Sequence, residues 1–146
     1  ATPDGGLSAA AFRRLVDEAA AAERARRAAV DAAREVERRK RIADLAETRL
    51  DEATWRDLLD RARTAAANGE RELLLLRFPS DLCSDRGRAI NAPDPTWPTT
   101  LRGVAAEVFL RWERELKPAG FGLTAQILDF PGGFPGDAGL TLRWGG

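Results

Sequence analysis

A short segment between Phe78 and Asn91 holds the side chains that are most able to do chemistry. They are two carboxylates, one thiol and two guanidinium groups, at Asp81, Cys83, Asp85, Arg86 and Arg88. The arginines could clamp an anion such as a phosphorylated ligand, and the carboxylates could hold magnesium, which takes oxygen ligands. Loops that leave the end of a strand often carry such sites, so a ligand site, if the chain has one, is predicted here.

The same segment also has a structural interpretation, which the sequence favours. Loop aspartates such as Asp81 and Asp85 commonly accept hydrogen bonds within turns, and an isolated cysteine is commonly a small buried residue. The arginines would then pair with acids. Cys83 would act as a nucleophile only if Arg86, Arg88 or a helix N-terminus stabilised its thiolate, because the chain has no His.

The absence of His and Tyr removes several kinds of active site. A Ser-His-Asp triad, a Cys-His pair and an imidazole-ligated zinc all need a residue that the chain lacks. The glycine-rich run 131–139 does not match a P-loop, because it has no Lys and precedes a strand instead of a helix. No catalytic signature emerges, so we expect a non-enzymatic role that requires no cofactor and no metal.

Charge and cysteine content limit the possible surroundings of the protein. Its 23 basic and 23 acidic residues cancel, so no overall field attracts a phosphate backbone or an anionic membrane. The basic run Arg38–Arg41 has acidic neighbours and is interpreted as a solvated helix face, so nucleic acid is not expected as a partner. A single cysteine and the lack of a long apolar run predict a cytoplasmic protein that does not enter membranes.

The N-terminal half has the composition of long helices. From Leu7 to Asn68 there is no Gly or Pro, and Ala, Arg, Glu and Leu dominate. A break is expected near residue 50, where Asp51 can cap a new helix and the flanking Leu50 and Trp55 can form a hydrophobic staple. The sequence therefore predicts one helix over 8–49 and a second over 52–67.

One face of the first predicted helix carries a narrow apolar seam. Its members recur every seven residues, as in a coiled coil. They are Leu15, Ala22, Ala29, Val36, Ala43 and Leu50. An alanine-rich seam allows close helix packing but buries little area, so this helix needs a partner. The partner could be the second helix in an intramolecular hairpin, another copy, or another protein. A basic stretch of the first helix is followed by an acidic stretch, and these opposite charges would suit an antiparallel fold-back or a staggered dimer.

The C-terminal half has the composition of strands and turns, with most of the Gly and Pro. The apolar run Glu72–Phe78 predicts a strand covered on both faces, near the centre of a sheet. An amphipathic helix is predicted after it, with a stripe from Leu101 to Leu116 and a cap at Thr99 or Thr100. Two further strands are predicted within 121–130 and 140–144, antiparallel and joined by a wide loop.

Together these patterns predict an α+β protein. A long N-terminal helical arm or hairpin, residues 1–69, would precede a small β-α-β-β domain with a three-stranded sheet, residues 70–146. We expect a protein–protein interaction, assembly or regulatory module that self-associates or binds a larger complex through its N-terminal helices. The alternative is a small enzyme or ligand-binding domain that uses the loop from Asp81 to Arg88 for an anionic or metal-bound ligand.

Overall fold

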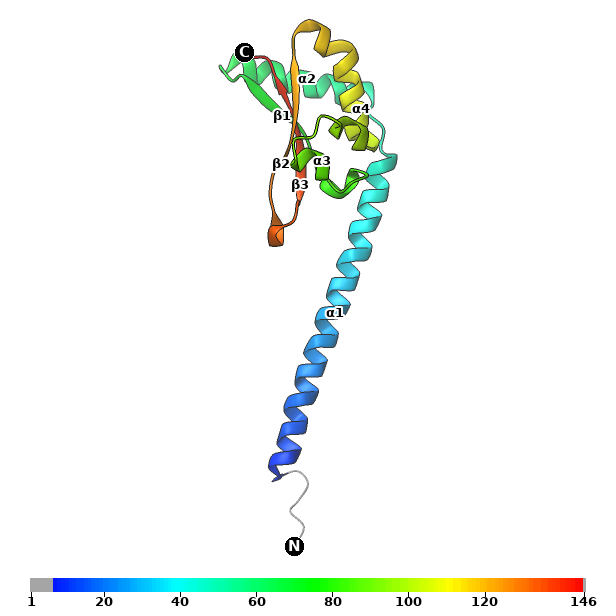
Figure 1. Ribbon diagram of the computed structural model, residues 1–146, viewed down its shortest axis with the longest axis vertical. Coiled ribbons are helices and arrows are strands. Elements are labelled where there is room, and N and C mark those ends of the chain that lie inside the picture. Colours follow the sequence, from blue (N-terminus) through cyan, green and yellow to red (C-terminus); the bar gives the residue numbers. More distant parts are fainter. Residues whose placement is uncertain (1–6, 146) are drawn as a thin grey trace. The chain divides into compact units, whose positions relative to one another are not determined.

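The computed structural model describes residues 7–145 and confirms the α+β class (Figure 1). A long N-terminal helix is followed by a three-stranded antiparallel sheet with its own helices. The chain divides into two compact units, Ala1–Arg41 and Ile42–Gly146, which are described separately below.

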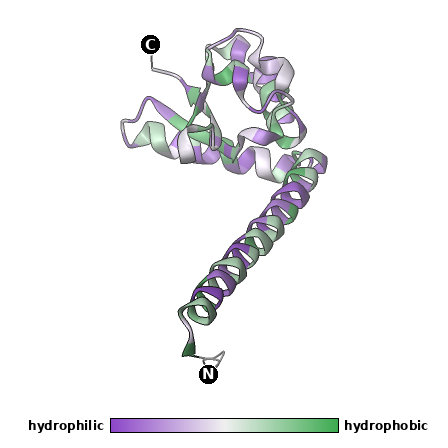
Figure 2. Ribbon diagram, turned by 60° about the horizontal axis from the view of Figure 1, so that its bottom comes forward, coloured by the Kyte–Doolittle hydropathy of each residue, from purple (hydrophilic) through white to green (hydrophobic). Residues whose placement is uncertain are grey.

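Helix α1 runs from Ala9 to Glu47, so it ends two residues before the predicted boundary. Ser8 caps it: the backbone N–H of Ala11 donates to the Ser8 hydroxyl at 3.0 Å. None of the side chains in α1 is buried. Hydrophilic and hydrophobic residues both occur along its whole length (Figure 2).

Helix α2 runs from Glu52 to Ala67, as predicted. The Asp51 carboxylate accepts the N–H of Thr54 at 2.7 Å, which is the expected cap. One face of α2 buries Trp55, Leu58 and Ala62 in a core shared with strand β1. The predicted division after residue 69 grouped α2 with the first helix, whereas its packing places it in the same compact unit as the sheet.

The sheet consists of β1 (Glu72–Pro79), β2 (Gly122–Ile127) and β3 (Asp137–Arg143) in the order β1-β3-β2. Both pairings are antiparallel, and Leu142 of β3 lies between Leu73 of β1 and Leu123 of β2. The prediction that the Glu72–Phe78 strand is central was therefore wrong. β3 takes that place because its residues 138–142 are all buried, including Gly139 and Thr141 on the second face.

The last two strands also differ from their predicted ranges: β2 ends earlier than predicted, and β3 begins earlier than predicted. β2 ends at Ile127, because Leu128 and Asp129 turn back toward β3: the Leu128 N–H donates to the Asp137 carbonyl at 2.7 Å. β3 accordingly begins at Asp137, three residues before the prediction. Leu123, Ala125 and Ile127 form the core-facing side of β2.

Between β1 and β2 the chain forms α3 (Arg88–Asn91) and α4 (Gly103–Arg111), of which the sequence predicted only the second. The predicted cap of that helix was wrong. Thr99 and Thr100 lie in a 3-10 helix, Trp97–Thr100, and their hydroxyls donate backwards to the carbonyls of Thr96 and Trp97. Leu101 and Arg102 are then extended, so α4 cannot begin before Gly103.

The apolar stripe of the α4 region is confirmed, although its backbone changes form. After Arg111 the helix widens into one π turn, Trp112–Leu116, and a 3-10 turn to Ala119 completes it. The Trp112 indole N–H donates to the Phe121 carbonyl at 3.1 Å. Ala105, Val108 and Trp112 are buried with α2 and β3 in one core of the second unit.

Candidate functional site

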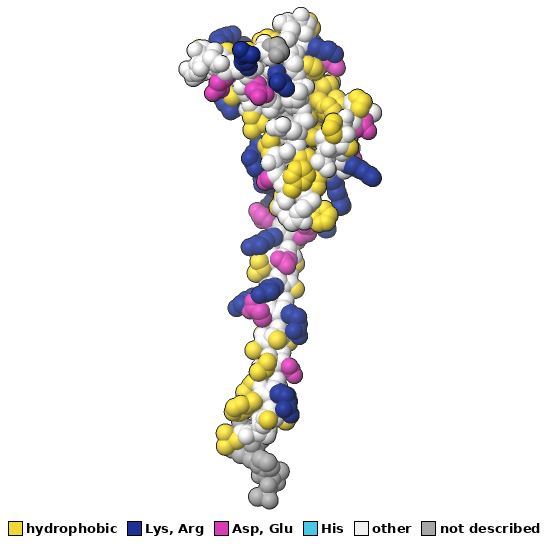
Figure 3. Space-filling view, turned by 60° about the vertical axis from the view of Figure 1, so that its left-hand side comes forward, with side chains coloured by type: hydrophobic (Ala, Val, Ile, Leu, Met, Phe, Trp, Pro, Cys, Tyr) yellow, Lys and Arg dark blue, Asp and Glu magenta, His cyan; other side chains and the backbone are white. Residues whose placement is uncertain are grey.

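The predicted seam lies on an exposed face of α1. Leu15 and Val36 are 61% and 66% exposed, which is unusual for side chains of this size. Ala22 and Ala29 are also exposed between them. Figure 3 shows hydrophobic and charged side chains side by side along α1. None of the described residues 7–41 is buried, so this part of the chain has no core of its own to which the seam could belong.

The last member of the predicted seam has a different role. Leu50 follows the end of α1 and is half-buried against the core of the second unit. It is thus already packed within the chain, while Ala43 stays exposed near the C-terminal end of α1. From here on, "the α1 seam" denotes the exposed members that lie in the first unit: Leu15, Ala22, Ala29 and Val36.

Three large apolar residues beside the α1 seam were missed in the sequence. Phe12 is 56% exposed, and Val16 and Val30 are exposed as well. Phe12 precedes Leu15 by three residues, so the two lie on the same side of a helix. A search at spacings of three and four, in addition to seven, would have found it. Val16 and Val30 share a different heptad position and lie to one side of the seam.

Ionic side chains on α1 pair along the helix. Arg27 and Arg39 bond Glu23 and Glu35, each four residues earlier, at 3.2 and 3.1 Å. Exposed pairs of this kind stabilise a helix by only about 0.3–0.5 kcal/mol each. These ion pairs therefore add a little to the stability of the α1 helix. They do not explain why its apolar side chains are exposed.

The second candidate site lies in a segment of tight turns between β1 and α3. Its predicted residues are Asp81, Cys83, Asp85, Arg86 and Arg88. Asp85 accepts the N–H groups of Gly87 and Ala89 at 3.0 and 2.8 Å, one on each carboxylate oxygen. It thereby holds the start of α3. This contact matches the structural interpretation of Asp85 as a residue that shapes a turn.

Other members of the loop also have structural contacts. The guanidinium of Arg102, a residue outside the predicted site, donates to the backbone carbonyls of Asp81 and Leu82 at 2.9 and 2.7 Å. The side chains of Arg86 and Arg88 are exposed. Within residues 7–145 no cluster of three or more Asp, Glu or Cys residues is arranged to hold a metal ion.

Cys83 is buried, with 1% of its surface exposed. Burial raises the pKa of its thiol, and the neighbouring Asp85 raises it further, while a hydrogen bond with Thr100 and the charge of Arg102 act in the opposite direction. A thiol that is buried and has a raised pKa carries little thiolate at neutral pH. Its surroundings thus match those of a structural cysteine.

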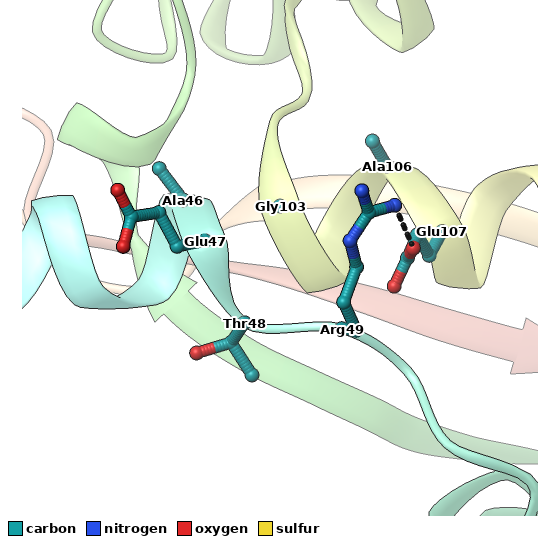
Figure 4. A pocket seen from close by; sticks show the side chains of 7 residues that line it. All are labelled: Ala46, Glu47, Thr48, Arg49, Gly103, Ala106 and Glu107. Carbon is teal, nitrogen blue, oxygen red and sulfur yellow. Dashed lines mark hydrogen bonds and ion pairs between the residues drawn. The ribbon is translucent and has the colours of Figure 1, made fainter.

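An open pocket of about 550 Å³ lies in the second unit, where residues 46–49 meet α4 (Figure 4). Its charged lining includes Arg49 and Glu107, which form an ion pair at 3.1 Å. The Glu107 carboxylate also accepts the backbone N–H of Leu50, and this bond lowers the pKa of Glu107. Arg49 and Glu107 are therefore occupied by contacts within the chain, and Glu47 is the third charged residue that lines the pocket.

No family model, curated protein or solved structure matches this chain. Among residues 7–145, no helix combines the length and the apolar character that crossing a bilayer requires. Within residues 7–145, the α1 seam is a set of apolar side chains that stays exposed on a long helix.

Proposed function

We propose that this chain is a non-enzymatic protein–protein interaction module that assembles through helix α1. In this proposal the α1 seam packs against another helix, of a second copy or of a larger complex, as in a coiled coil. The compact unit formed by residues 42–146 is then carried as a folded domain on the assembling helix. We place the protein in the cytoplasm, which its single, buried cysteine supports.

One observation supports the proposal above all others: α1 extends over 39 residues, buries none of them, and exposes Leu15, Val36 and Phe12. Most helices in proteins owe their stability to the packing of an apolar face. In α1 that face is present in the sequence and exposed in the single chain. A partner helix would remove it from water.

The composition of the seam indicates how such a partner would pack. Alanines at the centre, Ala22 and Ala29, allow two helix backbones to approach closely, while the larger side chains near each end supply most of the buried area. Because only a few large side chains are available on each helix, we expect weak self-association, with a dissociation constant on the order of micromolar.

The test is the mass of the full chain in solution, measured by sedimentation equilibrium and light scattering over a wide concentration range. We expect the average mass to rise from monomer toward dimer as the concentration increases. The double variant Leu15→Glu with Val36→Glu should remain monomeric, because it would place charges inside the seam.

The matched control is Val16→Glu with Val30→Glu, which changes two exposed apolar residues to the same charged residue at a heptad position beside the seam. This control should still associate. A mass that stays monomeric at every concentration would contradict self-association through α1. Equal loss of association in both double variants would contradict the assignment of the seam.

A further inference from the structure

We infer that α1 pairs with α1 of a second copy in antiparallel orientation, in the register that brings Arg14 opposite the partner's Glu35. This inference rests on the proposed function and adds the identity of the partner, its direction and its alignment. It follows from the placement of four charged residues on or beside the seam.

A parallel pair in register would place every seam residue opposite itself. The second heptad series of the interface, which lies beside the α1 seam, contains Glu18 and Arg39 among alanines. A parallel dimer would therefore bring Glu18 against Glu18 and Arg39 against Arg39 at the contact line. Like charges placed directly opposite each other at an interface are unfavourable.

A parallel pair has one favourable feature, since Glu35 and Lys40 occupy flanking positions that would face each other across it. That ion pair lies at the rim, where solvent screens it. The two like-charge layers lie nearer the contact line and are less screened. The balance favours the antiparallel direction.

An antiparallel pair matches residues of the α1 seam with residues of the second series, and few registers are possible. In the proposed one, Leu15 faces the partner's Ala32 and Ala22 faces the partner's Ala25. Arg14 and Glu35 then occupy facing flanks, twice by symmetry. Glu35 already binds Arg39 of its own helix through one carboxylate oxygen, and a carboxylate can accept several donors.

The neighbouring registers are less favourable. A shift by one heptad in one direction places Leu15 opposite Arg39 and brings Arg26 against Arg26. A shift in the other direction leaves Val36 beyond the start of the partner's α1, which begins at Ala9. Only the proposed register keeps both large seam residues paired and sets opposite charges on the flanks.

Side-chain volumes fit the same register. Large residues then face small ones: Leu15 meets Ala32, Phe12 meets Ala33, and Val36 meets Ala11 of the second copy. Such alternation lets facing layers interdigitate, whereas a parallel pair would set Leu15 against Leu15 and alanine against alanine. The overlap from Ala9 to Arg38 spans roughly 45 Å, and it ends before the second unit begins at Ile42.

Disulfide trapping tests the direction. In a Cys83→Ser background, one protein carries Ala11→Cys and another carries Val36→Cys, both close to the original side chains in size. Oxidation of the mixture should give the mixed disulfide, while each protein alone should give little. Predominant Val36→Cys homodimers, with wild-type-like mass behaviour, would overturn the antiparallel inference and leave self-association standing.

A charge exchange tests the register. Glu35→Arg should weaken the dimer about tenfold, because it replaces two opposite-charge contacts by two like-charge contacts. Adding Arg14→Glu should restore the wild-type affinity. A parallel dimer would lose its Glu35–Lys40 contact and gain nothing from the second change, so failure of the rescue in an associating protein would overturn the register. A chain that remains monomeric throughout would overturn the inference together with self-association.

Discussion

The carboxylate of Glu107 in α4 accepts the backbone N–H of Leu50, a residue 57 positions earlier in the chain. Its other oxygen accepts from the Arg49 guanidinium at 3.1 Å. Leu50 immediately precedes Asp51, the cap of α2. One side chain of α4 therefore fixes the connection at which α2 begins, and this connection forms a wall of the pocket shown in Figure 4.

Replacement of Glu107 by Ala should destabilise the second unit by about 1–3 kcal/mol, because the half-buried N–H of Leu50 would lose its acceptor. Urea titration followed by tryptophan fluorescence measures this effect, since all four tryptophans lie within residues 42–146. Arg49→Ala is the matched control. It removes only an exposed ion partner and should cost less than about 1 kcal/mol. If Glu107→Ala and Arg49→Ala lowered the free energy of unfolding equally, the hydrogen bond to the Leu50 N–H would not be the main contribution of Glu107.

The contribution of Glu107 should depend on pH. The Leu50 N–H lowers the pKa of Glu107, with a smaller contribution from Arg49, and partial burial opposes the shift. A carboxyl group whose pKa is lower in the folded protein than in the unfolded chain stabilises the fold at any pH above its unfolded-state pKa, ordinarily 4.5. That stabilisation is lost as the pH falls through its folded-state pKa. The stability difference between wild type and Glu107→Gln should therefore be constant near neutral pH and shrink below about pH 4.5. A difference that grows in acid would contradict this.

Gly103 should tolerate no side chain. Its φ is +58°, and a Cβ at this position would overlap the carbonyl oxygen of Leu45 at the end of α1. We expect Gly103→Ala to cost more than about 3 kcal/mol, because backbone strain and a steric clash act together. Gly132→Ala is the control for φ alone: that glycine has φ +65° and no heavy atom near its missing Cβ, so about 1–2 kcal/mol is expected. The same urea titration measures both variants.

Cys83 should react with a thiol reagent only when the second unit unfolds. Its thiol is buried and its pKa is raised by that burial, so the native protein presents neither access nor thiolate. Labelling with a disulfide reagent at neutral pH should be slow in native buffer and rapid in concentrated guanidinium chloride. Ala22→Cys, exposed on α1, is the positive control in the same chain. Fast native labelling of Cys83 would instead support a reactive site in the Asp81–Arg88 loop.

Local signals accounted for helices α1 and α2 and for the positions of the strands within a few residues. The bounds of α2 were predictable because Asp51 supplies its cap and Asn68-Gly69 follows its end. A strand was also predicted within 121–130, where β2 lies, and the structure places Leu123, Ala125 and Ile127 on its core side. These features depend on interactions between residues a few positions apart, which the sequence displays directly.

Long-range contacts account for what was missed. Nothing near Glu107 or Arg102 in the sequence points to Leu50 or to the carbonyls of Asp81 and Leu82, because those partners are tens of residues away. The late start of α4 has a similar cause. Thr99 and Thr100 are good capping residues, yet their hydroxyls bond preceding carbonyls in a 3-10 turn.

The sequence by itself determined that α1 is a continuous helix with a narrow seam at Leu15 and Val36, because helical propensity and a seven-residue spacing are local properties. Tertiary structure alone decided that β3 is the central strand, that α2 belongs to the core of the sheet, and that Asp85 and Glu107 are occupied within the chain. The reason is physical: strand order and hydrogen-bond partners depend on which distant surfaces exclude water together, and that choice is made by the whole chain.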